Sequence, residues 1–555
     1  MLIVLLILLP LICAGLIVFN PKGQAKYIAT GASLVSVVIA AVALFYFDFA
    51  ESAVDQMAVS IPWVPALGLE ASLAVDSVSL LLIALTVLLG PICVIGSFTA
   101  VKHDVKTYYA WLLVLQSAMI GVFAARDLVL FYICFEFTLI PMYILISLYG
   151  SANRKKAATK FFLYTFTGSV IALAGFVYVV WFHSSLPGNE WSFDLATLGE
   201  SARLMSPTQQ GWVLFALLAG FAVKVPLFPV HTWLPLAHTE APTAGSVILA
   251  GVLLKLGTYG IYKFALPYAP VAVVEYAPLI GVLSVIGIVY AGLICWVQTD
   301  VKRLVAYSSV SHLGFCVLGL VAINSVGVAG SVMYMISHGF STGALFLMIG
   351  MMYERYHTRS MREVGGLGSK MPIWSAFMVF FVMASVGLPG LNGFISEIMC
   401  LMGTFMSYGW TGEGGVAPGG TAGTLGPWFA FFAGVGMIVA AMYLLIMTGK
   451  MVWGTYREPE GHHEHEELPT DLNGREIGLL IPLAVGCLLF GLYPKPLLSA
   501  IEAPVNQTVA HFDGLVPAVD AGGAIDVAGI PSEITREQNY DGLDLEMIRA
   551  EEGSR

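Results

Sequence analysis

The stretch AVKVPLFPVHTWLPLAHTEAPTAGSVILAGVLLKLGTYG, residues 222–260, decides the fold of this chain. It is apolar enough for the lipid core, yet it contains Lys224, which lies in the apolar segment WVLFALLAGFAVKVPLFP (212–229), and Lys255, which lies in GSVILAGVLLKLGTYGIY (245–262). A charged side chain at the bilayer centre costs about 2.5–3.5 kcal/mol or more, so such residues usually face a bundle interior and serve transport. The stretch therefore predicts membrane-spanning helices that hold ionisable groups between them.

Two carboxylates lie in equally apolar surroundings. Glu136 is in DLVLFYICFEFTLIPMYILI (127–146), and Glu397 is in VGLPGLNGFISEIMCLM (386–402). Two acids and two bases at membrane depth predict a route for protons or cations through the membrane.

The composition assigns the whole chain to the bilayer. It is 58% hydrophobic and only 11% charged, whereas soluble domains carry about 25% charged residues. All seven cysteines fall in apolar stretches without a CxxC motif. They predict neither disulfides nor an iron–sulfur cluster, so we expect no redox centre, cofactor or metal in this chain.

Apolar runs of about 20 residues predict an all-α polytopic membrane protein with about 14 transmembrane helices. The first run lacks the basic start and cleavage site of a signal peptide, which favours a transmembrane helix. The expected spans are residues 2–20, 28–48, 76–100, 108–125, 127–148, 158–183, 209–234, 243–266, 274–297, 303–323, 327–353, 372–408, 427–453 and 476–498.

The seventh and twelfth spans contain helix-breaking sequences, KVPLFP at 224–229 and GLPGLNG at 387–393. Irregular backbone at membrane depth is tolerated where it lines a cavity or is buried in protein. The breaks lie five spans apart, which predicts two inverted five-helix repeats, spans 4–8 and 9–13, with discontinuous helices 7 and 12. The alternative is that proline and glycine are simply tolerated in these helices.

These spans divide the chain into five expected parts. They are an N-terminal group of three helices (1–107), the first repeat (108–266), the second repeat (267–453), a cytoplasmic loop with the last helix (454–498) and an acidic extramembrane tail (499–555). We assign no fold to the tail. The loop around His462, His463 and His465 has no tertiary ligand set, so we expect no metal site there.

Lysine and arginine alternate from loop to loop, with 17 on one side and seven on the other. The rich side is expected to be cytoplasmic. We therefore expect a multi-pass protein of a bacterial inner membrane, with both termini on the non-cytoplasmic side.

The buried charges suggest how the route is built. Glu136 and Lys224 lie at comparable depth, so an ion pair is available, and its making or breaking would change which group holds a proton. A purely structural ion pair is the alternative. Lys255 has no acid in its own span and is too central to reach the surface, which favours a proton relay.

Histidines 231, 238, 312 and 338 fall in or beside spans 7, 10 and 11. Histidine titrates near neutral pH and suits a relay, although a lone membrane histidine is more often a hydrogen-bonded structural group. Glu397 follows the second break and is the candidate exit group, or else an acid favoured by the start of a helix. Four polar residues next to His312 are candidates for holding water: Tyr307, Ser308, Ser309 and Ser311.

The chain resembles the antiporter-like membrane subunits of respiratory complex I, the proton-pumping NADH:quinone oxidoreductase, and among them the NuoM type. The resemblance covers about residues 1–498 and is carried by FYICFEFTLIPMYILI (131–146), residues 222–260 quoted above, DVKRLVAYSSVSHLGF (300–315), MYMISHGFSTGALFLMIG (333–350) and SVGLPGLNGFISE (385–397).

The resemblance implies the 14-helix fold with inverted repeats. It implies a proton relay made of Glu136, Lys224, Lys255, Glu397, His231, His312 and His338. Glu397 is informative because the related NuoL, NuoN and Mrp subunits tend to carry lysine at that place.

It also implies NuoL- and NuoN-type neighbours in the membrane, and partner subunits that carry NADH, FMN, iron–sulfur clusters and quinone. We expect no nucleic-acid partner. The alternative functions are an Mrp-type cation/proton antiporter subunit and a passive scaffold.

Overall fold

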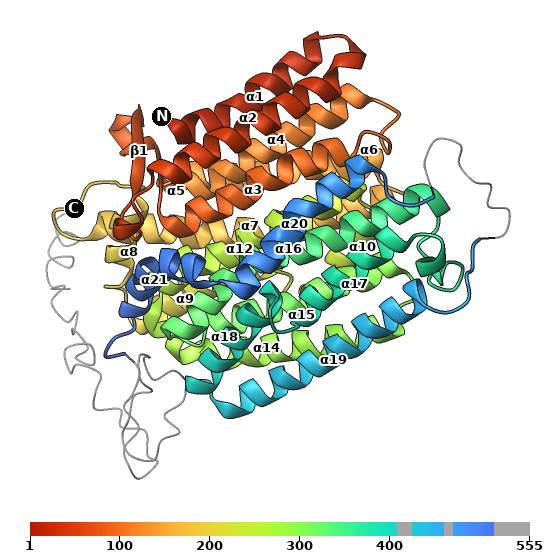
Figure 1. Ribbon diagram of the computed structural model, residues 1–555. Coiled ribbons are helices and arrows are strands. Elements are labelled where there is room, and N and C mark those ends of the chain that lie inside the picture. The colour runs from red at the N-terminus through yellow and green to blue at the C-terminus, as the bar shows by residue number, and fades with distance from the viewer. Residues whose placement is uncertain (408–423, 460–469, 516–555) are drawn as a thin grey trace, which may run out of the picture.

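The computed structural model describes residues 1–407, 424–459 and 470–515. Its long helices lie side by side in one bundle, with α1 and α2 along one edge and α19 along the opposite edge (Figure 1). Within the described residues, 12 helices are long and apolar enough to cross a membrane. The predicted all-α membrane fold is confirmed.

The first half of the chain contains α1 (Leu2–Phe19), α2 (Ala25–Tyr46), α3 (Ser77–Gly96), α4 (Val105–Ala124), α5 (Leu128–Phe137), α6 (Leu139–Tyr149), α7 (Arg154–Ser185), α8 (Leu195–Ala202), α9 (Pro207–Lys224), α10 (Leu234–Glu240), α11 (Thr243–Ile248), α12 (Leu254–Gly260) and α13 (Leu266–Tyr268). Two π-helical segments, η4 (Leu249–Leu253) and η5 (Ile261–Ala265), join α11, α12 and α13 into one continuous helical span.

The second half contains α14 (Pro270–Val297), α15 (Val301–Leu320), α16 (Ser325–Tyr356), α17 (Pro372–Val386), α18 (Asn392–Met406), α19 (Pro427–Val452), α20 (Gly474–Leu492) and α21 (Lys495–Ala510). The most apolar 18 residues of the span Thr243–Tyr268, and those of α16, are all buried by other helices. They form the centre of the bundle, where ionisable groups are shielded from lipid.

The two predicted helix breaks are present. Helix α9 ends at Lys224, residues 225–233 are irregular, and α10 begins at Leu234. Helix α17 ends at Val386, and α18 begins at Asn392 after five irregular residues. The 12 continuous candidate spans and these two broken segments agree in position with the 14 expected spans. The number of membrane crossings and the inverted repeats remain predictions.

Two local features beside buried charges were not predicted. The fifth span is interrupted at Thr138, which separates α5 from α6 two residues after Glu136. The eighth span contains the π-helical segments η4 and η5 on both sides of Lys255. Such π-bulges are frequent at functional sites. Both features modify the backbone beside a buried charge.

A two-stranded antiparallel hairpin, β1 (Gln56–Val64) and β2 (Leu69–Val75), lies between α2 and α3. Arg126 binds Asp55 before the hairpin at 2.7 Å and Asp76 after it at 3.7 Å. Lys263 also binds Asp76, at 2.8 Å. This ion cluster fastens both ends of the hairpin to the helical bundle.

The start of the tail, to which we assigned no fold, is helical. Of residues 499–555 the structure describes 499–515, and most of these belong to α21. Helix α21 packs against α16 and α3. It lies at the end of the bundle that also holds the N-terminus, β1 and α8 (Figure 1). The His462–His465 run lies outside the described residues.

Candidate functional site

Lys224 is the last residue of α9, where proline ends the helix. The C-terminal end of a helix carries partial negative charge and favours a cation. The backbone freed by the break is satisfied locally, because Trp233 Nε1 donates to the Val223 carbonyl at 2.9 Å. Lys224 is only 3% exposed. The break thus holds a buried ammonium beside a helix terminus.

Lys224 and Glu136 do not form the direct ion pair that the sequence suggested. Lys224 Nζ donates instead to Thr138 Oγ1 at 3.2 Å and lies 4.3 Å from the centroid of the Phe135 ring. Both carboxylate oxygens of Glu136 are buried without a hydrogen-bond partner in the described part of the chain. The two groups interact electrostatically from neighbouring positions around the α5–α6 break.

Lys255 is completely buried in α12, between the two π-helical segments. Its Nζ donates to the Ala250 carbonyl in η4 and lies 2.7 Å from His338 Nδ1 in α16. No carboxylate pairs with Lys255 within the residues that the structure describes. The amine nitrogen is therefore in direct contact with the next group that can carry a proton.

From His338 the polar groups continue to Glu397. The His338 and His312 ring centroids are 5.9 Å apart. His312 Nδ1 lies 3.2 Å from Glu397 Oε1. Tyr334 donates its hydroxyl to Glu397 Oε1 at 2.5 Å, and the same hydroxyl is 2.6 Å from His312 Nδ1. Lys255, His338, His312, Tyr334 and Glu397 thus form a buried polar chain.

The break between α17 and α18 positions Glu397. Gly387 follows the last residue of α17 and adopts a left-handed conformation with φ +82°. A Cβ at Gly387 would lie 2.7 Å from Glu397 Oε2, so any larger residue would force the carboxylate to move from this position. Asn392 Nδ2 donates to the Ser337 carbonyl at 3.0 Å, which ties the break to α16.

The two remaining histidines make no hydrogen bond to this chain within the described residues. His231 lies in the break of the seventh span, with its ring centroid 5.7 Å from that of Phe228. Its Nδ1 has no partner among the described residues. His238 is completely buried on α10 and stacks on Phe346 with centroids 4.5 Å apart. The structure therefore unites Lys255, His338, His312 and Glu397, but not His231.

Sequence reasoning missed Tyr334 and Thr138. Tyr334 precedes His338 by four residues and so shares its helix face, a signal that would have identified it. Thr138 follows Glu136 by two residues, and nothing in the sequence marks it as a partner of Lys224. Of the serines expected to hold water, Ser308 donates to the Val305 carbonyl at 2.8 Å and Ser311 to the Ile288 carbonyl at 2.9 Å.

The chemistry of the arrangement is proton transfer. Its members are amines, imidazoles, a phenol and carboxyls, which gain and lose single protons. Across the described ranges, no group of three or more His, Cys, Asp or Glu side chains is placed to hold a metal ion. The site thus offers a line of exchangeable protons through the middle of the bundle.

Comparison with known proteins agrees with this arrangement. Residues 125–414 match the family model for the transmembrane region of the NADH:quinone oxidoreductase/Mrp antiporter proteins. NADH-quinone oxidoreductase subunit M of Rhodobacter capsulatus is 38% identical over 526 residues, covering 91% of this chain and 94% of that protein. NADH-ubiquinone oxidoreductase chain 4 of Marchantia polymorpha is 38% identical over 509 residues, covering 91% and 96%.

Solved structures show the same fold. A chain in respiratory complex I from Thermus thermophilus with bound NADH matches with a TM-score of 0.79 and 26% identity, covering 92% of this chain and 99% of that chain. A chain of the Mrp complex from Dietzia sp. DQ12-45-1b matches with a TM-score of 0.77 and 20% identity, covering 92% and 52%. The second likeness concerns the fold alone.

Proposed function

Because the chain belongs to the NADH:quinone oxidoreductase/Mrp antiporter membrane family, we propose that its buried charges carry protons across the membrane. It is a proton-pumping, antiporter-like membrane subunit of NADH:quinone oxidoreductase, or complex I, and its partners are other membrane subunits of that complex. Full-length similarity to subunit M and chain 4 proteins favours this function over an Mrp-type antiporter.

The observation that carries the relay is the buried polar chain from Lys255 to Glu397. A proton enters from the cytoplasmic side and reaches Lys224 and Glu136. It passes to Lys255 and then by way of His338 and His312 to Glu397, from which it leaves on the opposite face. Tyr334 supports the last step, because its hydroxyl contacts both His312 and Glu397.

The driving force comes from redox chemistry in partner subunits, which carry NADH, FMN, iron–sulfur clusters and quinone. Changes in those subunits alter the surroundings of Lys224, which decides whether its amine keeps its proton. A shift of Lys224 from Thr138 towards Glu136 would pair the two charges, and the reverse shift would release the proton to the relay. His231, in the same break, is placed to respond to such a shift.

The orientation follows from the loops. We assign the lysine- and arginine-rich face to the cytoplasm of a bacterial cell, so that both termini lie on the non-cytoplasmic side of its inner membrane. The N-terminus, β1, α8 and α21 share one end of the bundle, which supports this assignment (Figure 1).

The test is NADH-driven proton pumping by the purified complex in proteoliposomes. Lys224→Ala and Glu136→Ala are each expected to abolish or sharply reduce pumping while the complex still assembles. Wild-type pumping by either assembled variant would contradict the relay. Purification of the chain without NADH- and quinone-handling subunits, together with sodium-dependent proton exchange in vesicles, would favour the antiporter alternative.

A further inference from the structure

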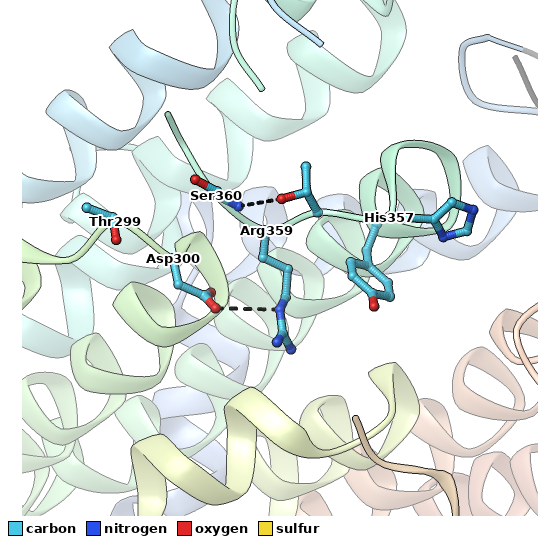
Figure 2. Close-up of a pocket in the computed structure, with 7 residues that line it drawn as sticks. Thr299, Asp300, His357, Arg359 and Ser360 are labelled. Atoms are coloured by element: carbon cyan, nitrogen blue, oxygen red, sulfur yellow. Dashed lines mark hydrogen bonds and ion pairs between the residues drawn. The ribbon is translucent and has the colours of Figure 1, made fainter. Parts of the chain in front are cut away.

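A polar pocket of about 280 Å³ lies between the start of α15 and the end of α16, on the face that we assign to the cytoplasm. Its lining includes Asp300, His357 and Arg359. The Asp300 carboxylate faces the Arg359 guanidinium, with Oδ2 and Nε 3.5 Å apart, while His357 points away from both (Figure 2). A water molecule occupies about 30 Å³ in the liquid. The pocket therefore has room for several waters at the surface of the protein.

A buried lysine lies next to this pocket. Asp300 caps the start of α15, where its Oδ1 accepts a hydrogen bond from the Lys302 backbone N–H at 2.8 Å, so Lys302 lies two residues after the pocket wall. Its side chain turns inward and the residue is only 6% exposed. Lys302 Nζ donates to the Ala241 carbonyl at 2.5 Å and makes no ion pair within the described ranges. A buried ammonium that has only a neutral acceptor is costly.

Lys302 contacts the end of α10, and that helix carries two buried titratable groups, Glu240 and His238. Glu240 accepts hydrogen bonds from Ser151 and Asn153, so we consider His238. It precedes Ala241 by three residues and is completely buried. Neither of its ring nitrogens has a partner in the part of the chain that the structure describes. Its ring interacts electrostatically with both Lys302 and Lys255. A buried imidazole with two free nitrogens, three residues before the carbonyl that Lys302 contacts, can take up and release a proton there.

A structural role is the competing explanation. Lys302 and Arg359 donate to the Ala241 and Thr239 carbonyls at the end of α10, and cations stabilise that end of a helix. Capping requires only a positive charge with donors, which arginine supplies as well as lysine. Helix capping by Lys302 does not involve the two free nitrogens of His238. The two explanations therefore predict different results for charge-conserving and ring-conserving substitutions.

We propose that Lys302 is a second proton-uptake group, which carries protons from the Asp300–Arg359 pocket by way of His238 to Lys255. The Lys302 ammonium gives one proton to the neutral His238 imidazole, and the imidazolium gives one proton to the Lys255 amine. The Lys302 amine then takes a proton from water in the pocket. This inference rests on the proposed function, because it supplies the same relay from a second point.

The test uses the purified whole complex in proteoliposomes, with pumping and NADH oxidation measured together and assembly checked by co-purification. The variants are Lys302→Arg, which keeps the charge but holds its proton permanently, Lys302→Met, and His238→Phe, which keeps a stacked ring. Lys106 is the matched control, because it also donates to a backbone carbonyl, that of Val18 at 3.0 Å, but lies away from the pocket.

All three variants are expected to lower proton pumping by about tenfold or more, whereas Lys106→Arg and Lys106→Met pump like the wild type. Normal pumping by Lys302→Arg would assign Lys302 to helix capping and overturn the proposal. If the Lys302 variants do not assemble, His238→Phe decides, and wild-type pumping by it overturns the proposal. If Lys224→Ala loses pumping while the Lys302 and His238 variants pump like the wild type, this inference is overturned and the proposed function stands.

Discussion

Lys255 and His338 touch each other across the centre of the bundle, with Lys255 Nζ 2.7 Å from His338 Nδ1. They are 83 residues apart and lie on the two helical segments that form the centre of the bundle. Lys255 belongs to the first predicted repeat and His338 to the second. Their contact therefore joins the two halves of the proposed proton route.

The Tyr334 hydroxyl is expected to be required for the last transfer of the relay. Tyr334→Phe removes the contacts with His312 and Glu397 while it keeps the ring, so proton pumping should fall several-fold in a complex that still assembles. Tyr268→Phe is the control, because the buried Tyr268 hydroxyl also makes a hydrogen bond, to the Leu195 carbonyl at 2.8 Å, away from the chain. Equal pumping rates in the two variants would argue against a role for Tyr334.

Thr138 is expected to hold Lys224 in place. Thr138→Val keeps the shape of the side chain but removes the acceptor at 3.2 Å from Lys224 Nζ. Pumping in proteoliposomes should decrease, because the ammonium loses its hydrogen bond. Thr165→Val removes a buried hydroxyl that bonds only to backbone carbonyls of its own helix, so it should leave pumping unchanged. A Thr138→Val complex as active as Thr165→Val would contradict this positioning role.

Alanine substitutions at two glycines in the break between α17 and α18 can distinguish the effect of backbone strain from the effect of contact with Glu397. Gly387 and Gly390 both have positive φ, +82° and +92°, so alanine is strained at each by about 1–2 kcal/mol. Only at Gly387 would the added Cβ meet Glu397 Oε2, at 2.7 Å, whereas at Gly390 the nearest atom is 3.6 Å away. Pumping per assembled complex should fall much further in Gly387→Ala than in Gly390→Ala. The opposite order would show that the break acts through backbone conformation alone.

The ion cluster around Arg126 is expected to hold the β1–β2 hairpin. Arg126→Met removes the bonds to Asp55 and Asp76, so the hairpin amides should exchange hydrogen faster, while Arg362→Met at an exposed site has no such effect. Unchanged exchange in Arg126→Met would show that the hairpin is held by other contacts.

Acid should protonate Asp76, and so weaken the attachment of the hairpin to the bundle, only at very low pH. Burial alone would raise the pKa of the Asp76 carboxyl, but Lys263 and Arg126 hold that pKa well below its usual range. A carboxyl with a lowered pKa stabilises the fold above its unfolded pKa, and that stability is lost as pH falls through the folded value. Protection of the hairpin should therefore be constant from about pH 5 to pH 8, after correction for intrinsic exchange rates. A loss of protection near pH 5 would contradict the cluster.

Much of the architecture was predictable because apolar length and helix-breaking residues are local signals. The sixth span, expected at 158–183, is α7 at Arg154–Ser185, and both breaks fall at the Pro- and Gly-containing sequences. The hairpin was not predicted, and its ends contact Arg126 and Lys263 from distant segments of the chain. The π-helical turns around Lys255 lie in the bundle centre and have no local signal in the sequence that we identified.

The candidate site was predicted as a set of residue types but not as a set of contacts. Glu397, His312, His338 and Lys255 do meet, because their helices pack around one centre. The expected Lys224–Glu136 ion pair is replaced by the Thr138 hydrogen bond, since depth along a span does not fix side-chain direction. Lys302 falls in the loop between the expected spans 274–297 and 303–323, and only the fold shows that it is buried.

The central claim is that protons cross the membrane through this chain by way of Lys255. The most direct measurement is the rate of proton movement, recorded together with the rate of NADH oxidation, for Lys255→Met complexes in proteoliposomes. The rate of proton movement is expected to fall by about tenfold or more in a complex that still assembles. An assembled Lys255→Met complex with wild-type pumping and oxidation would contradict the account.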